Sequence, residues 1–379
     1  MRERGEEGDF HGGHATRQQR VNFVSAAVLN GREFGSSETP QGSVCDSGNI
    51  NKMDEKARKC GVRPCHPLKS LKELQSFRDF CCSFERVKNQ STDARIEQPL
   101  PDRPRVLLCH DMAGGYLEDR YYCTELFAEQ RKVSGDYDPK KDYRFDHWDR
   151  IDIFVYFSHN FITVPPCKWT QEAHANGVKM LGTIIIEWKL EVLQELLDPS
   201  ANDQVIENLV DLCVCGNFDG WLLNMEVKGD PDLVTALRDM ITTLRKRLLE
   251  RKPGSLVLWY DSLVTTGKIA YQNELNQLNK PFFDDCDGIF LNYGWNERSL
   301  GTSKATAGER VLDVYVGIDV FGRQTGYTGG FNTPQVAKEV IDKGLSVAIF
   351  APGWVLECND VRDFSQNQEK FWGIMPVLR

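Results

Sequence analysis

The sequence has 379 residues, of which 41% are hydrophobic and 10% aromatic, a composition that supports a large apolar core and excludes wholesale disorder. Lys and Arg number 46 against 55 Asp and Glu, a net charge of −9. This acidity argues against a nucleic-acid binder, because such proteins present a basic surface. No run of about 18 apolar residues occurs, so we expect no membrane span.

Residues 1–64 differ in composition from the rest of the chain. They are rich in Gly, Ser, Asn, Arg and Glu, with little apolar periodicity, which predicts a disordered extension. The first residues lack the apolar stretch of a secretory signal, so we expect a cytosolic protein. The 12 cysteines form no CxxC motif, and we interpret them as free thiols rather than disulfides or a metal site.

The first regular element is expected at residues 67–74, where leucines recur with helical spacing and Ser70 is a candidate cap. From about residue 105, short and nearly continuous apolar runs recur, as is typical of strands buried on both faces. There are eight such runs, at residues 105–109, 151–158, 179–188, 220–226, 255–262, 288–295, 314–322 and 346–354.

The segments between these runs have helical patterns, as in residues 205–213 and 233–249. The runs start about 34 residues apart, which is the length of one strand-and-helix unit. Eight strands that alternate with helices predict an α/β fold, the (β/α)8 TIM barrel. The alternative is a doubly wound open sheet, which usually has fewer strands and a Gly-rich phosphate turn. The sequence has no GxGxxG motif.

Polar and aromatic residues end the predicted strands, where a barrel of this kind carries its catalytic groups. The ends read His110-Asp111, Ser158-His159, Glu187-Trp188, Asn224-Met225-Glu226, Trp259-Tyr260-Asp261, Asn292-Tyr293-Gly294-Trp295, Asp319-Val320-Phe321 and Pro352-Gly353-Trp354. Aromatic rings pack on the apolar face of a sugar, while amides and acids bind its hydroxyls. These strand ends therefore indicate a carbohydrate site.

The segment Phe218–Glu226 is the most informative of these. Residues two apart on a strand face the same side, so if Leu222 fills the barrel core, Asn224 and Glu226 point into its mouth. A partly desolvated carboxyl there would have a raised pKa and could protonate a leaving oxygen. The amide could hold a substrate amide. A salt bridge from Glu226 to a loop cation is the structural alternative.

Nine groups of residues occur along the sequence in the same order as in a known family. They are His110-Asp111-Met112 with Gly114-Gly115-Tyr116, residues 152–159, Leu181-Gly182-Thr183 with Glu187-Trp188, Phe218-Asp219-Gly220-Trp221 with Asn224 and Glu226, residues 258–262, Asp287-Gly288 with Asn292-Tyr293, residues 314–321, residues 350–354, and Gln366-Asn367-Gln368 with Phe371-Trp372. Together they resemble the cytosolic endo-β-N-acetylglucosaminidases of glycoside hydrolase family 85. The resemblance covers roughly residue 66 to the end.

The resemblance implies a barrel that hydrolyses the β-1,4 bond between the two core GlcNAc residues of N-linked glycans, on free oligosaccharides, glycopeptides or glycoproteins. It also implies a retaining, substrate-assisted reaction, in which the 2-acetamido oxygen attacks C1 and forms an oxazolinium. Glu226 matches the general acid/base, Asn224 the residue that orients the acetamide, and Tyr260 a tyrosine close to the reaction centre. The mechanism requires neither a metal nor another cofactor.

Other strand-end residues are candidate glycan contacts. The polar candidates are Glu187, Asn292, Tyr293 and Asp319, and for the two acids a loop bridge or helix cap is the alternative. The candidate sugar platforms are Trp188, Trp259, Trp295 and Trp354, for which core packing is the alternative. We interpret His110 and His159 as hydrogen-bonding groups, since the mechanism needs no histidine.

Three features differ from the family pattern. Residues 121–144 replace a loop of the barrel mouth, and the loop at residues 189–191 is short. The sequence ends at Arg379, so we expect a catalytic barrel over residues 65–379 with a shortened last helix, and no C-terminal β-sandwich modules.

The competing function is a non-catalytic glycan-binding barrel, which the presence of both Asn224 and Glu226 argues against. A chitinase-like hydrolase would carry a run of aspartates before the acid, where this sequence has Gly220, Leu222 and Asn224. A structural scaffold would leave the polar and aromatic strand ends unexplained.

Overall fold

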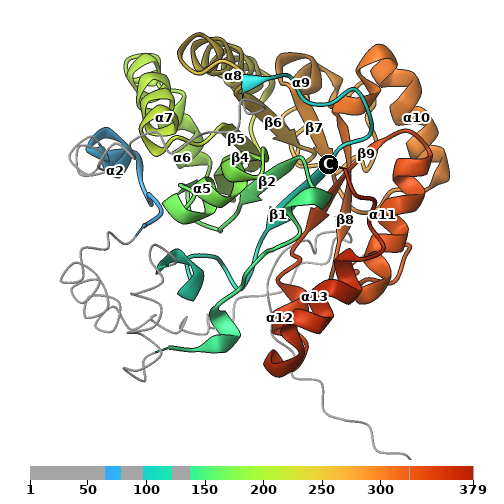
Figure 1. The fold of residues 1–379 in the computed structure, drawn as a ribbon. Coiled ribbons are helices and arrows are strands. Elements are labelled where there is room, and N and C mark those ends of the chain that lie inside the picture. Colours follow the sequence, from blue (N-terminus) through green and yellow to red (C-terminus); the bar gives the residue numbers. More distant parts are fainter. Residues whose placement is uncertain (1–64, 78–96, 122–136, 324, 379) are drawn as a thin grey trace, which may run out of the picture. The chain divides into compact units, whose positions relative to one another are not determined.

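The computed structural model describes residues 65–77, 97–121, 137–323 and 325–378, and in these ranges the eight apolar runs form eight parallel strands (Figure 1). Neighbouring strands pair in parallel, and the pairings of β1 with β9 and of β2 with β4 close the ring. The predicted (β/α)8 barrel is therefore confirmed. The strands are β1 (Val106–His110), β2 (Ile153–Tyr156), β4 (Lys179–Glu187), β5 (Gly220–Glu226), β6 (Leu256–Tyr260), β7 (Gly288–Leu291), β8 (Val314–Asp319) and β9 (Ser346–Phe350).

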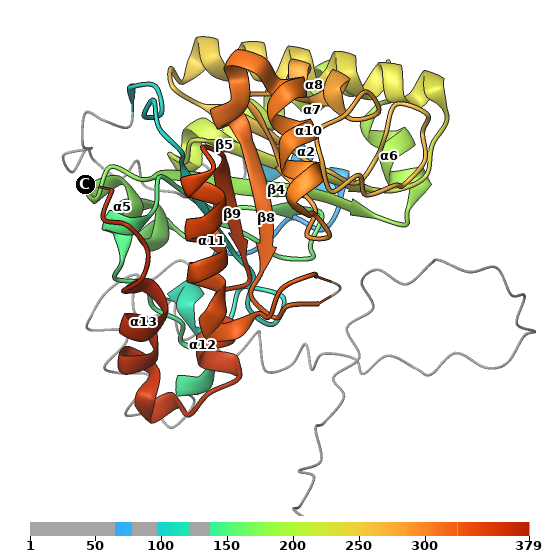
Figure 2. The same cartoon turned by 90° about the vertical axis from the view of Figure 1, so that its right-hand side faces the viewer.

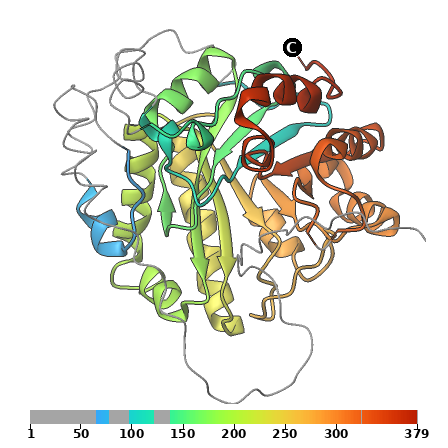
Figure 3. The same ribbon diagram turned by 90° about the horizontal axis from the view of Figure 1, so that it is seen from below.

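Helices lie around the strands (Figure 3). After β2, one or two α-helices lie between successive barrel strands or follow the last one. They are α5 (Cys167–Ala175), α6 (Leu190–Leu196), α7 (Asn202–Gly216), α8 (Pro231–Arg251), α9 (Lys280–Asp285), α10 (Glu297–Ala307), α11 (Thr333–Asp342), α12 (Trp354–Glu357) and α13 (Phe364–Trp372). Local sequence sets their starts, as in α8, where Pro231 opens the helix and the Asp230 side chain accepts a hydrogen bond from Leu233 N at 2.8 Å.

Two short elements lie beside the barrel. The predicted N-terminal helix is α2 (Leu71–Gln75), and the Ser70 hydroxyl caps it by accepting from Glu73 N at 3.2 Å. The strand β3 (Ile162–Thr163) pairs antiparallel with β4. Sequence periodicity did not predict β3, because two residues are too few to form a pattern.

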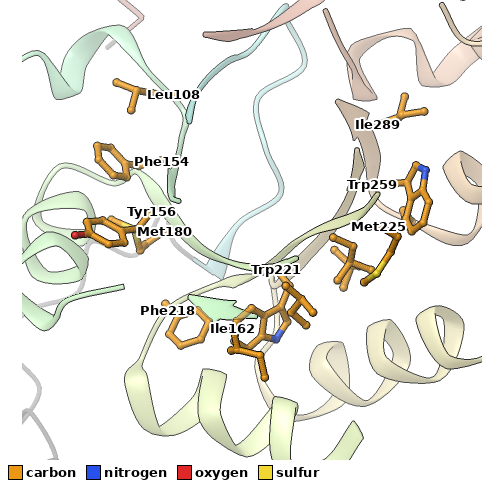
Figure 4. Close-up of a cluster of buried hydrophobic side chains, with 14 of the residues drawn as sticks. Leu108, Phe154, Tyr156, Ile162, Met180, Phe218, Trp221, Met225, Trp259 and Ile289 are labelled. Atoms are coloured by element: carbon orange, nitrogen blue, oxygen red, sulfur yellow. The ribbon is translucent and has the colours of Figure 1, made fainter. Parts of the chain in front are cut away.

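The strands separate two buried layers by the alternation of their side chains. Leu222 and Leu258 belong to the cluster that fills the barrel interior. Trp221, Met225 and Trp259 belong to the larger cluster between the strands and the helices (Figure 4). Because Leu222 points inward, the residues two and four positions later on β5 also face the interior at its carboxyl end.

The amino end of β5 comes from the first residues of the segment Phe218–Glu226. Asp219 is fully buried and accepts hydrogen bonds from His174 Nε2 at 2.7 Å and Met180 N at 2.8 Å. Burial alone would raise the pKa of Asp219, but His174 and the charge of Lys252 hold it below the usual value. Gly220 has φ of +135°, and a Cβ there would lie 1.8 Å from Leu256 O. Asp219 and Gly220 therefore fix the seam between neighbouring strands.

The last strand is followed by α12 and α13, which contact each other, and α13 also contacts α11 (Figure 2). After α13 ends at Trp372, Leu378 N still donates to Asp149 O at 2.8 Å. No helix in the described ranges is long and apolar enough to cross a membrane. The predicted extension at residues 1–64, and residues 122–136 of the variant loop, lie outside the described residues.

Candidate active site

Glu226 ends β5 at the carboxyl end of the barrel, with only 5% of its surface exposed. Asn224 Nδ2 donates to Glu226 Oε1 at 3.2 Å, and the Tyr271 hydroxyl donates to Oε2 at 3.1 Å. Burial raises the pKa of Glu226 and the charge of Glu187 adds to this, while both hydrogen bonds and the charge of His159 act against it. The pKa of this buried carboxyl is therefore shifted upward, which is the direction that a general acid requires.

Asn224 shares the inward face of β5 with the acid, as the sequence predicted, and is 6% exposed. Its amide nitrogen is used by Glu226, whereas its buried oxygen, Oδ1, has no hydrogen-bond partner among the described residues. A buried acceptor without a partner is costly unless a ligand supplies a donor. Asn224 can therefore receive an N–H group from a substrate bound beside Glu226.

Tyr260 ends β6 and faces inward, level with Asn224 on the neighbouring strand. Its hydroxyl donates to Asn292 Oδ1 at 2.9 Å, and Asn292 Nδ2 donates to Asn273 Oδ1 at 2.7 Å. The ring of Tyr293 lies 6.4 Å from that of Tyr260. The structure thus brings Tyr260, Asn292 and Tyr293 together beside the acid.

Glu187 ends β4 and is the direct cross-strand partner of Glu226. Both of its carboxylate oxygens contact His159 Nδ1, at 3.2 and 3.3 Å. The bond to Glu187 raises the pKa of His159 despite partial burial, and the charges of Asp111 and Glu226 act in the same direction. An acid and a histidine that follow different strands therefore form one ion pair close to Glu226.

Trp188 follows Glu187 and is 57% exposed. Its backbone lies in the left-handed region, with φ of +63°, and its N–H donates to Glu226 O at 2.9 Å. A bulky residue in this region is strained and persists where the surroundings hold it. The exposed ring is thus anchored next to the acid and remains a candidate sugar platform.

Trp259 requires a correction. It is fully buried in the outer layer and stacks on Phe282 with ring centroids 4.2 Å apart (Figure 4). The residue lies one position from the inward-facing Tyr260 and so points to the helices, as the alternation of a strand requires. The structure therefore gives Trp259 a packing role, not a place at the barrel mouth.

Trp295 and Trp354 also pack against the outer core. The Trp295 indole donates to Gly317 O at 2.7 Å, and the ring of Trp354 lies 5.1 Å from that of Phe331. Both side chains remain partly exposed, so their role as sugar platforms stays a prediction.

Asp319 is buried, and its carboxylate accepts hydrogen bonds from the loop that follows β8. Its two carboxylate oxygens accept from the Arg323 guanidinium at 2.8 and 2.9 Å, and they also accept from the backbone N–H groups of Phe321 and Arg323. A carboxylate with this many donors is occupied. The loop-bridging alternative therefore describes Asp319 better than a direct glycan contact.

The sequence did not predict the roles of three residues at the barrel mouth. They are Asp111, His159 as the ion-pair partner of Glu187, and Tyr271. Asp111 follows β1, its Oδ1 is buried with no hydrogen-bond partner in the described part of the chain, and burial raises its pKa. Counting in twos from the inward Leu107 and Phe157 would have found Asp111 and His159. No comparable signal marks Tyr271, which lies in a loop.

A polar cavity of about 470 Å³ is lined in part by Asn273, whose Oδ1 accepts from Asn292 Nδ2 and from Gly294 N. Its lining residues are Gln272, Asn273, Glu274, Gly294, Asn296, Arg298, Ser299 and Thr302. Amide and hydroxyl groups of this kind suit the hydroxyls of a sugar. As for metals, no group of three or more His, Cys, Asp or Glu within the described ranges could hold an ion.

A sequence model of glycosyl hydrolase family 85 matches residues 124–376, which is well over half of the chain. The chain therefore belongs to this family. The family match, the closed barrel and the acid at the carboxyl end of β5 agree with one another, since active sites of such barrels lie at that end.

Several curated proteins are similar to the chain. Cytosolic endo-beta-N-acetylglucosaminidase of Mus musculus is 46% identical over 277 residues, which are 72% of this chain and 36% of that protein. The Homo sapiens protein of the same name is 42% identical over 310 residues, 81% of this chain and 40% of that protein. The chain thus spans well under half of the length of these relatives.

Among solved structures, the glycoside hydrolase domain of Endo-D from Streptococcus pneumoniae R6 has a TM-score of 0.57 with 18% sequence identity. The match covers 80% of this chain and 50% of that chain. At this identity the similarity supports the fold.

Proposed function

We propose that the chain is an endoglycosidase that hydrolyses the β-1,4 bond between the two core GlcNAc residues of N-linked glycans, on free oligosaccharides, glycopeptides or glycoproteins. The proposal rests on two residues of the inward face of β5. The carboxyl of Glu226 is buried and has a raised pKa, and beside it the amide oxygen of Asn224 has no hydrogen-bond partner in the described part of the chain. The names of the relatives support the same activity and a cytosolic location.

In the first step, protonated Glu226 gives its proton to the glycosidic oxygen. The bond from C1 to that oxygen breaks, and its electron pair stays on the departing sugar. The acetamide oxygen of the other sugar forms a new bond to C1, which gives an oxazolinium. Asn224 Oδ1 accepts the acetamide N–H, so the amide is oriented for attack and its developing positive charge is stabilised.

In the second step, ionised Glu226 takes a proton from water. The water oxygen bonds to C1 and the bond from C1 to the acetamide oxygen breaks, which restores the acetamide. Each step inverts C1, so the overall configuration is retained. The same carboxyl acts first as acid and then as base.

A two-carboxylate reaction, with Glu187 as the nucleophile, is the rival within the same site. Retaining enzymes of that kind place two carboxyl groups about 5–5.5 Å apart, and Glu187 is the cross-strand partner of Glu226. Both oxygens of Glu187, however, contact His159, whereas Asn224 offers a free acceptor. These contacts favour the acetamide as nucleophile.

The test is mass spectrometry of a high-mannose glycopeptide after incubation with the purified chain. The proposal predicts a peptide that retains one GlcNAc. A folded chain that binds the glycopeptide and leaves it intact would contradict hydrolysis and indicate a glycan-binding barrel.

The step assigned to Asn224 has its own test. Asn224→Ala should cleave the glycopeptide slowly, yet still hydrolyse a preformed sugar oxazoline, because the attack that Asn224 assists has already occurred. Equal loss on both substrates would contradict this role.

A further inference from the structure

We propose that Tyr271 is a positioning residue for the acid/base: its hydroxyl accepts a hydrogen bond from protonated Glu226 and donates one to ionised Glu226, and so holds the carboxyl in one place through both steps. The inference rests on the proposed function, because it concerns the same acid.

The two oxygens of Glu226 have chemically different partners. Oε1 lies 3.2 Å from Asn224 Nδ2, and Oε2 lies 3.1 Å from the Tyr271 hydroxyl. Oε1 can accept from the amide in both protonation states, because a protonated carboxyl keeps a carbonyl oxygen. Oε2 changes between an ionised oxygen and an O–H group when it carries the acid proton. A hydroxyl can donate or accept, so Tyr271 can keep its hydrogen bond to Oε2 in both states, which an amide nitrogen in its place could not do.

The loop between β6 and α9 fixes the position of Tyr271. Asn273, which has φ of +58°, donates from Nδ2 to Tyr271 O at 3.2 Å. Its backbone N donates to the fully buried Asp261 at 2.8 Å, and its Oδ1 accepts from Asn292 and Gly294. The loops after β6 and β7 are thus tied together, and the tyrosine hydroxyl reaches Glu226 from a loop that is held by several hydrogen bonds.

The charges around Glu226 agree with this role. Burial and the neighbouring Glu187 of β4 favour the protonated acid, while Asn224, Tyr271 and His159 favour the ionised form. Burial and the charge of Glu226 raise the pKa of Tyr271 itself, so its hydroxyl keeps its proton. Tyr271 therefore acts by hydrogen bonding and does not exchange a proton with the substrate.

The first test measures the titration of Glu226 directly and needs no activity. Infrared difference spectra between the wild-type chain and Glu226→Gln isolate the Glu226 carboxyl band, and the same subtraction is made in a Tyr271→Phe background. Because the lost donor stabilised the ionised form, the midpoint should rise by about one pH unit. An unchanged or lowered midpoint would overturn the proposal.

The matched control is Tyr315→Phe, the same chemical change at a buried tyrosine. Tyr315 lies near the start of β8, at the opposite end of the barrel from Glu226. The Glu226 midpoint should stay at its wild-type value. A rise equal to that of Tyr271→Phe would mean that loosened packing causes the shift, which would also overturn the proposal.

The second test is kinetic. In Tyr271→Phe, kcat on a glycopeptide should fall about tenfold with KM within about twofold, since one hydrogen bond to the acid is lost. The alkaline limb of the pH profile should move upward with the infrared midpoint. A raised KM with an unmoved profile would make Tyr271 a substrate contact instead. If the wild-type chain cleaves no glycopeptide, the proposed function fails, while the infrared titration still decides the role of Tyr271.

Discussion

Glu187→Gln is expected to lower the pKa of Glu226 and to narrow the pH range of activity from the alkaline side. Glu187 and Glu226 are cross-strand partners whose side chains point into the same barrel mouth, and the charge of Glu187 raises the pKa of Glu226. The glutamine keeps the size of the side chain and removes the charge. Hydrolysis needs protonated Glu226, so a lower pKa ends activity at a lower pH.

The size of this effect follows from the spacing of the strands. Adjacent strands lie about 4.8 Å apart, which puts the two carboxylates roughly 6 Å apart. The Glu187 side chain is 24% exposed, so an effective dielectric constant of about 40, between protein and water, is appropriate. Coulomb's law then gives about 1.4 kcal/mol, which is about one pH unit. Without Glu187, His159 is less readily protonated, and a weaker positive charge there would raise the pKa of Glu226 and offset part of this decrease.

The assay is the pH dependence of kcat/KM on a glycopeptide, which reports ionisation of the free enzyme. His159→Gln is the matched control, because it removes a positive charge from the same ion pair and should move the alkaline limb upward. A limb that does not move in Glu187→Gln, or that moves upward, would refute the coupling. Loss of activity at every pH would instead identify Glu187 as the nucleophile.

Two further predictions concern the aromatic platform and the base of β5. Trp188→Ala removes an exposed ring at a strained position, so KM should rise about tenfold without a lower thermal midpoint; an unchanged KM would remove Trp188 from the glycan site. Asp219→Asn weakens the buried pair with His174 and should cost about 3 kcal/mol of unfolding free energy in urea. The pKa of Asp219 is depressed below 3.8 in the folded chain, so this stabilisation is present above that pH and lost as the pH falls through the folded value. A stability difference that persists unchanged at the lowest pH would contradict the assignment.

The strands could be predicted from the sequence because burial on both faces makes each one a continuous apolar run. The same property hides which residues face inward, since no polar alternation is visible. Trp259 and Tyr260 are neighbours at one strand end, yet one packs under α9 and the other lines the mouth. The inward face was identified only on β5, where Leu222, Asn224 and Glu226 are two residues apart and therefore face the same side of the strand.

Tyr271 could not be predicted because it lies 45 residues from Glu226 in a loop without periodicity. Its place depends on Asn273, whose left-handed backbone and contacts to Asp261 and Asn292 exist only after the barrel closes. Asp319 illustrates the opposite case. Its strand-end position was predicted correctly, but its partner Arg323 lies four residues later and occupies the carboxylate.

The most direct test of the central claim compares the wild-type chain with Glu226→Gln on the same glycopeptide, with turnover followed by mass spectrometry and binding by calorimetry. If Glu226 is the general acid/base, the variant should bind the glycopeptide with similar affinity and cleave it at least about 10²–10⁴-fold more slowly. Wild-type turnover by Glu226→Gln would contradict the account, because the proton that the leaving oxygen needs would then have to come from another group.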